Sequence, residues 1–283
     1  MSYIDERQLL KYLYTKPKAP AYISEKEKIE GLEEEIRKTQ VIILAGGTGK
    51  RMGNPNLPKA LQVVGEKTLI DRYMEVCAKC GLTNIILLIG FLHEEIMKHV
   101  GDGSRYGVSV RYCVDPPIKK VWKGKALKNA IQQKVIDLNK TSIIGYPDDI
   151  LLDENIPLKL LGYHLRLREK GVLATVVCVE GIEYPYGVAL SYDGEIVEKF
   201  FEKPIVRIPS SIGLCVIEPP VYEIIKEKVN MDDEEAVEFE SVVLPYLAEK
   251  GKLGRFTIGV GEWIPVNTQK DVEIAEKILR ERK

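Results

Sequence analysis

A glycine-rich loop carries the clearest chemical signal in this sequence. Residues 46–51 read Gly-Gly-Thr-Gly-Lys-Arg and directly follow the apolar run Val-Ile-Ile-Leu-Ala at 41–45. Glycines permit positive φ angles and close approach of a ligand, so successive backbone N–H groups can converge on one anion. Arg51 and Lys59 add two cationic side chains to the same region. This combination predicts a loop that binds phosphate groups.

Two common phosphate-binding motifs do not fit this loop. A Walker A motif would need glycine at position 44 and serine or threonine at position 51, where the chain has Leu44 and Arg51. A dinucleotide-binding G-x-G-x-x-G motif that starts at Gly47 would need glycine at position 52, where the chain has Met52. The loop therefore predicts phosphate binding of another type.

A pair of carboxylates follows a second apolar run. Residues 141–146 read Thr-Ser-Ile-Ile-Gly-Tyr and predict a buried strand, and Asp148 and Asp149 come just after it. Open α/β sheets bind ligands outside the carboxyl ends of their strands. Carboxylate oxygens suit Mg²⁺, a hard cation that bridges triphosphate oxygens. We predict that Asp148 binds Mg²⁺ and that Asp149 is either a second ligand or a turn cap.

The elements that must position these groups begin at residue 40. From there, short and almost continuously apolar runs alternate with amphipathic segments of helical length. The expected strands are 41–45, 84–89, 108–113, 141–145 and 172–179, and the expected helices are 67–80, 92–99, 124–138 and 157–169. Such alternation indicates a mainly parallel sheet that helices cover on both faces. The predicted fold class is α/β, with a Rossmann-like, doubly wound sheet.

The chain after about residue 180 predicts closely spaced short strands instead. Two alternating runs, 186–192 and 195–203, flank Asp193-Gly194, and Asp-Gly in that position is a strong hairpin signal. We therefore expect a small antiparallel subregion. Helices are expected after it near 219–229, 236–249 and 268–282.

The first 39 residues differ in composition from the rest. They are rich in charge and poor in glycine, and they read as helical around 5–14 and 25–38, with a break at 16–20. We expect a helical N-terminal extension over 1–39 and one domain over 40–283.

Composition narrows the class of partner. The 283 residues carry a net charge of −1, so the basic surface of a general nucleic-acid binder is not expected. No run of 18 apolar residues and no signal-peptide core is found, so we expect a cytoplasmic protein without membrane attachment. An odd number of cysteines, five, argues against a secreted disulfide framework. Few glutamines and many Ile, Lys and Glu residues indicate a thermophilic source.

The loop and the segments after it resemble the sugar-phosphate nucleotidyltransferases, the enzymes that make sugar nucleotides. Their pattern is roughly Leu-Ala-Gly-Gly-x-Gly-x-Arg-(Leu/Met) followed by Pro-Lys, and this chain has it at 44–52 with Pro58-Lys59 downstream. Four later segments resemble the same family in the same order: 90–113, 143–154, 186–204 and 211–219. The resemblance extends from about 40 to 282 and implies the mixed sheet of nucleotide-diphospho-sugar transferases, with the antiparallel subregion binding sugar.

The resemblance implies a reaction between a nucleoside triphosphate and a sugar 1-phosphate, which gives NDP-sugar and pyrophosphate with Mg²⁺ as the cofactor. The implied catalytic residues are Arg51, Lys59, Asp148 and Lys203. The implied nucleotide-binding residues are Leu44, Ala45, Gly46, Gly47, Thr48, Gly49, Lys50, Arg51, Lys59 and Gly124. The implied sugar-phosphate-binding residues are Tyr186, Gly187, Glu202, Lys203 and Gly213, and Asp148 and Asp149 are the metal ligands. Self-association into a homo-oligomer is compatible with the sequence.

Two departures from the family pattern keep alternatives open. Pro265 stands where relatives usually carry a second metal-binding aspartate, so either another group such as Asp149, Glu262 or Asn267 substitutes, or water completes the metal shell, or activity is impaired. The glutamine that often reads the nucleobase is not evident, and Asp115 or Lys120 could contribute in its place. The alternatives are a cytidylyl- or guanylyltransferase for a polyol, alcohol or cobinamide phosphate, and a catalytically silent regulatory relative.

Overall fold

The computed structural model describes residues 31–282, except for residues 53, 55, 119, 192, 193 and 236. The predicted helix around 5–14 and the predicted break at 16–20 lie outside the described residues, as does Asp193 of the predicted hairpin turn. Of the predicted helix at 25–38, the described part forms α2 (Leu32–Lys38).

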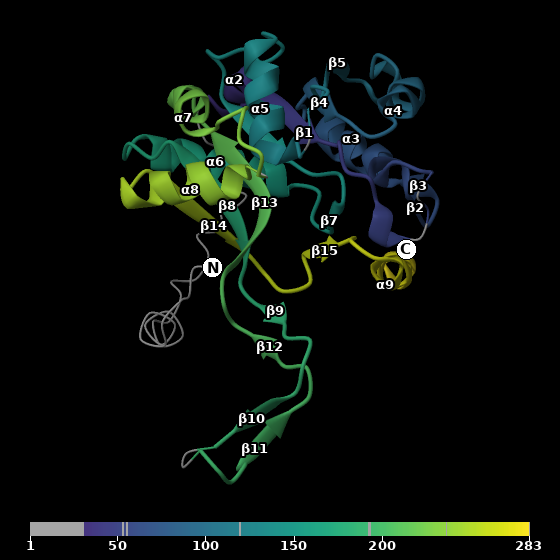
Figure 1. Cartoon of the computed structure of the whole chain (residues 1–283), viewed down its shortest axis with the longest axis vertical. Coiled ribbons are helices and arrows are strands. Elements are labelled where there is room, and N and C mark those ends of the chain that lie inside the picture. Colours follow the sequence, from purple (N-terminus) through teal and green to yellow (C-terminus); the bar gives the residue numbers. More distant parts are fainter. Residues whose placement is uncertain are drawn as a thin grey trace.

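A seven-stranded sheet forms the centre of the molecule, in the order β14-β8-β13-β6-β1-β4-β5 (Figure 1). Its strands are β1 (Gln40–Leu44), β4 (Asn84–Ile89), β5 (Ser109–Val114), β6 (Ser142–Gly145), β8 (Ala174–Val179), β13 (Ser210–Ile217) and β14 (Leu253–Ile258). Neighbouring strands are parallel except that β13 is antiparallel to both β6 and β8. The predicted mixed, mainly parallel α/β sheet is thereby confirmed.

Helices cover both faces of this sheet. The remaining helices are α3 (Leu69–Lys79), α4 (His93–Val100), α5 (Trp122–Gln132), α6 (Ile156–Arg168), α7 (Pro220–Lys228), α8 (Phe239–Glu249) and α9 (Gln269–Glu281). Side chains alternate along β1, so Val41 and Ile43 join one core with α3, α4 and α6, whereas Ile42 joins a second core with α5, α7 and α8. Both faces are buried, which is why the strands read as continuous apolar runs.

Short elements complete the body around this sheet. They are η1 (Lys50–Met52), η2 (Lys59–Leu61), η3 (Ser104–Tyr106), β2 (Val63–Val64) paired with β3 (Lys67–Thr68), and β7 (Asp149–Leu151) paired with β15 (Trp263–Pro265). Helix α9 packs against β2 and β15 through a third core that contains Val64, Ile264 and Val272. Thr268 caps the N-terminus of α9, because its hydroxyl accepts a hydrogen bond from the Asp271 N–H.

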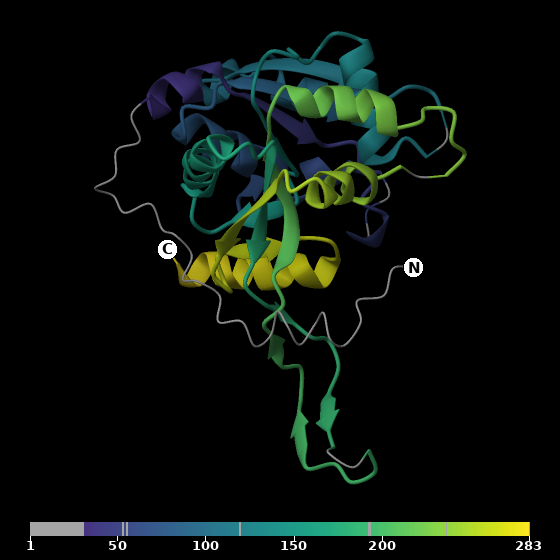
Figure 2. The same cartoon turned by 90° about the vertical axis from the view of Figure 1, so that its left-hand side faces the viewer.

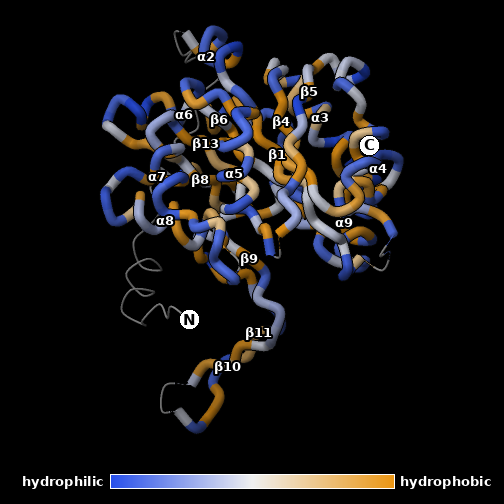
Figure 3. The backbone as a smooth tube through the Cα atoms, turned by 45° about the horizontal axis from the view of Figure 1, so that its top comes forward, coloured by the Kyte–Doolittle hydropathy of each residue, from blue (hydrophilic) through white to orange (hydrophobic). Residues whose placement is uncertain are grey.

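The predicted antiparallel subregion is an arm that leaves the body (Figures 1 and 2). It pairs β9 (Ile182–Glu183) with β12 (Ile205–Val206), and β10 (Val188–Leu190) with β11 (Lys199–Phe201). Hydrophobic residues colour both β10 and β11 (Figure 3), and Phe200 is nevertheless 64% exposed. None of the helices described above has the length and apolar character needed to cross a membrane.

Candidate functional site

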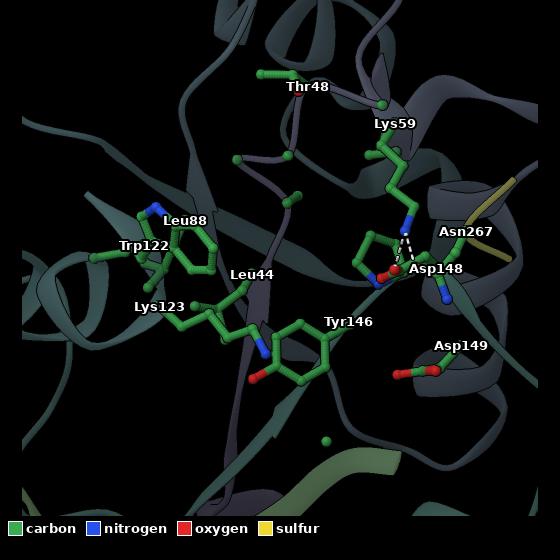
Figure 4. Close-up of a pocket in the computed structure, with 18 of the residues that line it drawn as sticks. Leu44, Thr48, Lys59, Leu88, Trp122, Lys123, Tyr146, Asp148, Asp149 and Asn267 are labelled. Carbon is green, nitrogen blue, oxygen red and sulfur yellow. Dashed lines mark hydrogen bonds and ion pairs between the residues drawn. The ribbon is translucent and has the colours of Figure 1, made fainter. Parts of the chain in front are cut away.

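A cleft of about 1360 Å³ opens at the carboxyl ends of β1 and β6. The glycine-rich loop forms one wall, Lys59 and Asp148 form part of another, and Trp122 and Tyr146 lie across from them (Figure 4). This is the position at which open α/β sheets bind their ligands. The strand that ends in the loop and the strand that ends before Asp148 are hydrogen-bonded neighbours, so the fold brings both predicted groups to one cleft.

The loop presents unpaired backbone donors. In the part of the chain that the structure describes, no N–H group of residues 46–49 donates to a backbone or side-chain acceptor. Gly49 has a φ of 63°, and a Cβ there would lie 3.3 Å from the Lys59 Cα, so glycine is needed for both conformation and space. The Lys59 N–H donates to the Gly47 carbonyl at 3.2 Å, which holds the lysine against the loop. Backbone N–H groups without an internal acceptor, next to a cation, are suited to a phosphate chain.

Lys59 joins the loop to the opposite side of the cleft. Its Nζ donates to the Asp148 carboxylate and, at 2.9 Å, to Asn267 Oδ1 (Figure 4). Both charged side chains are mostly buried, with exposed fractions of 17% for Lys59 and 25% for Asp148. A cation held this way is a fixed donor whose position does not need to reorganise when negative charge develops nearby.

Asp149 adds a second carboxylate beside the first. Trp263 Nε1 donates to Asp149 Oδ1 at 2.7 Å and fixes its orientation. Burial and the adjacent charge of Asp148 raise the pKa of the Asp149 carboxyl well above its usual range. No cluster of three or more His, Cys, Asp or Glu side chains that could bind a metal is found among the described residues. Two neighbouring carboxylates still fit Mg²⁺, because proteins commonly bind it with one or two carboxylates plus substrate phosphates.

A cluster of three polar side chains, Lys123, Tyr146 and Glu240, lines the cleft on the side of β13. Lys123 Nζ lies 2.8 Å from Glu240 Oε1 and 4.7 Å from the centre of the Tyr146 ring, and the Tyr146 hydroxyl donates to Glu240 at 2.7 Å. Gly213, at a φ of 90°, faces that ring, and a Cβ there would lie 2.4 Å from Tyr146 Cε2. The glycine therefore makes the space that the tyrosine ring occupies.

The structure brings most of the predicted nucleotide and metal residues to the cleft. Residues that line it are Leu44, Ala45, Gly46, Gly47, Thr48, Gly49, Lys50, Arg51, Lys59, Asp148, Asp149 and Gly213. Gly124 is not among them, since its N–H donates to the Val237 carbonyl at 2.9 Å and a Cβ would lie 2.6 Å from that oxygen. Its glycine is explained by close packing of α5 on the segment before α8.

The predicted sugar-phosphate residues on the arm are not brought to the cleft. Tyr186 is 68% exposed, and Glu202 and Lys203 are also exposed on the arm. Gly187 has a structural explanation there, because a Cβ would lie 2.4 Å from the Phe200 ring of the paired strand. The arm leaves the body after β8 and returns only at β13, so its length carries these side chains away from the cleft.

Several lining residues had no role in the sequence prediction, among them Trp122, Lys123, Tyr146 and Glu240. They come from the start of α5, the end of β6 and the start of α8, which are far apart along the chain. No local motif marks them. The one signal that could have found them is their place next to the predicted ends of strands and starts of helices.

The sequence of this chain is similar to those of known proteins. A sequence model described as nucleotidyl transferase matches residues 40–280. The mannose-1-phosphate guanyltransferases of Debaryomyces hansenii and Pichia angusta are 27% and 28% identical to the chain, and each alignment covers 81% of this chain and 61% of the relative. A UTP–glucose-1-phosphate uridylyltransferase of Synechocystis is 29% identical over 66% of this chain and 50% of the relative. The chain thus spans about three fifths or less of these relatives' length.

A solved structure from Bacillus anthracis, assigned as a glucose-1-phosphate thymidylyltransferase in complex with sucrose, has the same fold. It superposes with a TM-score of 0.66 at 23% sequence identity, and the match covers 86% of this chain and 96% of that one.

Proposed function

The chain belongs to the nucleotidyl transferase family, and we propose that it couples a nucleoside triphosphate to a sugar 1-phosphate to give an NDP-sugar and pyrophosphate. A sugar-phosphate oxygen attacks the α-phosphorus, the bond from that phosphorus to the bridging oxygen of the β-phosphate breaks, and pyrophosphate leaves with the electron pair. The observation that carries the proposal is the unpaired N–H groups of residues 46–49 facing a cleft that also contains Lys59 and Asp148.

The protein's part in this reaction is positioning and charge neutralisation, because phosphoryl and nucleotidyl transfer need little covalent help. The loop N–H groups and Arg51 bind the β- and γ-phosphates, where the charge of the leaving group develops. Lys59 binds the α-phosphate, and its ion pair with Asp148 orients it. Each such donor strengthens its interaction as charge moves toward pyrophosphate.

We propose Mg²⁺ as the cofactor, bound by Asp148 and Asp149. The donor set fits a hard cation, since it consists of carboxylate oxygens with the Asn267 amide oxygen nearby. When bound, the ion neutralises charge on the triphosphate and aligns its oxygens.

The acceptor is proposed to bind on the side of Gly213, Tyr146 and Glu240. Carboxylate and phenol groups there can hydrogen-bond sugar hydroxyls, and Lys123 can neutralise the sugar phosphate. The proposed roles of Glu202 and Lys203 in holding that phosphate need the arm to bend toward the cleft. A cytoplasmic location is also proposed, because all five cysteines are free and buried.

Pyrophosphate release with Mg²⁺ tests the proposal, in a panel that combines five nucleoside triphosphates with several sugar 1-phosphates and with polyol, alcohol and cobinamide phosphates. Release that needs both one nucleotide and one sugar 1-phosphate supports it. Release only with a polyol, alcohol or cobinamide phosphate shows that the acceptor is not a sugar. Silence in the whole panel, with nucleotide still bound, favours a regulatory relative, for which Pro265 at the metal position is the motivating observation.

A further inference from the structure

Asp115 is a carboxylate in the cleft wall that the proposed chemistry does not use. It follows β5, and its N–H donates to the Ile89 carbonyl at 2.8 Å, which fixes it at the edge of the cleft. A Cβ at Gly46 would lie 2.8 Å from Asp115 Oδ2, and a Cβ at Gly90 would lie 2.3 Å from the same atom. Two glycines therefore leave room for this carboxylate at the very start of the phosphate loop.

The carboxylate has no donor of its own. Within the described ranges, it accepts no hydrogen bond and forms no ion pair, and the titratable group that faces it is His93 of α4. Burial raises the pKa of the Asp115 carboxyl to about 6, which measures how little the surroundings solvate the charge. A partly buried carboxylate without a donor, in a cleft wall, is a group that a ligand can satisfy.

An apolar and aromatic surface lies in the same part of the cleft. Leu44, Leu88, Ala126 and Trp122 line it, and the Trp122 indole lies on the opposite side of the cleft from Lys59 (Figure 4). Trp122 is 54% exposed and has a φ of 43°, a left-handed conformation that residues other than glycine seldom adopt. An exposed indole in a cleft with apolar lining residues is a stacking surface for a planar ring.

We propose that Trp122 stacks on the nucleobase and that Asp115 selects guanine, so that GTP is the nucleotide substrate. This rests on the proposed function. Guanine is the common base with two adjacent donors on its Watson–Crick edge, N1–H and the N2 amino group, and a carboxylate can accept from both. Uracil and thymine present carbonyl oxygens on either side of their N3–H, which a carboxylate repels. Adenine and cytosine offer one amino group next to an acceptor nitrogen.

Equilibrium binding to the full-length chain tests the selectivity without requiring turnover. Displacement of a fluorescent GTP analogue by GTP, ITP and UTP gives three dissociation constants, and ITP differs from GTP only by the missing N2 amino group. We expect GTP to bind roughly 10- to 100-fold more tightly than UTP and about 10-fold more tightly than ITP, the range of one bidentate base contact. Equal affinity for GTP and ITP, or for GTP and UTP, overturns the proposal.

The variant Asp115→Asn tests the residue. It should lose the preference for GTP over UTP, because an amide presents one donor and one acceptor and so suits uracil. The exposed Glu94→Gln on α4 is the matched control and should keep the wild-type preference. Trp122→Ala should weaken all three nucleotides by about 10-fold and leave their ratios unchanged. Retained GTP preference in Asp115→Asn, in a variant whose circular dichroism matches wild type, contradicts the proposal.

These experiments distinguish a failure of the proposed reaction from a failure of the base assignment. GTP-selective binding without pyrophosphate release in the panel supports the base assignment and removes the proposed reaction. Pyrophosphate release with UTP as the preferred nucleotide supports the reaction and removes the base assignment.

Discussion

Replacing Lys59 with methionine tests the cleft most sharply, because methionine keeps an apolar chain of similar length and removes the charge together with its N–H donors. In the structure, this nitrogen donates to Asp148 and, at 2.9 Å, to Asn267, and its side chain is only 17% exposed. If it binds the α-phosphate, it is one fixed donor to the developing charge, and losing one such donor costs about 10²- to 10³-fold in kcat. Rapid-mix measurement of pyrophosphate release gives that ratio.

The same substitution should have a modest effect on stability. It breaks one mostly buried ion pair and leaves Asp148 next to Asp149 without the nearby cation, for which we expect a loss of roughly 1–3 kcal/mol in the free energy of unfolding. Urea unfolding followed by circular dichroism measures it. The catalytic loss must therefore be much larger than any loss of folded protein.

A matched control is available in an ion pair far from the cleft. Lys67 Nζ lies 2.6 Å from Glu75 Oε2, and both side chains are nearly half exposed. Lys67→Met should change kcat by less than about 2-fold and stability by no more than about 1 kcal/mol. A Lys59→Met enzyme with wild-type kcat, or a Lys67→Met enzyme with an equal loss, would refute the reasoning.

Three further perturbations follow from single contacts. Pro265→Asp adds a carboxylate opposite Asp149, its partner in the pairing of β15 with β7, so the Mg²⁺ concentration for half-maximal turnover should fall. An unchanged concentration would show that position 265 does not reach the metal. Gly213→Ala should lower the melting temperature and raise the KM for sugar 1-phosphate, because its Cβ meets the Tyr146 ring at 2.4 Å; unchanged values in both assays would contradict this. The pKa of Asp115 is raised to about 6 in the folded state, so this carboxyl lowers the stability of the fold increasingly as the pH rises from about 4 to 6. Asp115→Asn should therefore raise the melting temperature more at pH 8 than at pH 4.5. An equal rise at both pH values would contradict the pKa shift.

The sheet could be predicted because strands that are buried on both faces appear in the sequence as short runs of apolar residues. Strands such as Asn84–Ile89 are buried on both faces and therefore read as apolar throughout, and the glycine-rich loop follows directly from the first of them. Asp148 could be predicted for the same reason, since a polar residue just past a buried strand must lie at the sheet's edge. The capping box of Thr268 and Asp271 was also readable, because both partners lie within one turn.

The other half of the cleft could not be read in this way. Lys123, Tyr146 and Glu240 meet only because α5, β6 and α8 end at the same place in space. Lys125 is fully buried, and its Nζ donates to the Asp233 carbonyl, a contact that no pattern within α5 predicts. Such contacts depend on tertiary packing, which the hydrophobic periodicity of single helices and strands does not predict.

The arm shows a different limit of sequence reasoning. Alternating apolar residues indicated strands correctly, yet Phe200 and Phe201 are exposed because, within the part of the chain that the structure describes, no further layer packs on the paired strands. The hydrophobic pattern predicts pairing but does not say whether a further surface covers it. For this reason the arm's predicted sugar contacts stay a prediction.

Following labelled phosphate tests the central claim most directly. The protein is incubated with Mg²⁺, the sugar 1-phosphates of the panel and each nucleoside triphosphate in turn, labelled on its α-phosphate, and the products are separated. We expect the label of one nucleotide to enter a sugar nucleotide while unlabelled pyrophosphate forms in equal amount. Label that stays in every nucleoside triphosphate, or that appears in a nucleoside monophosphate without a sugar nucleotide, would contradict the proposed reaction.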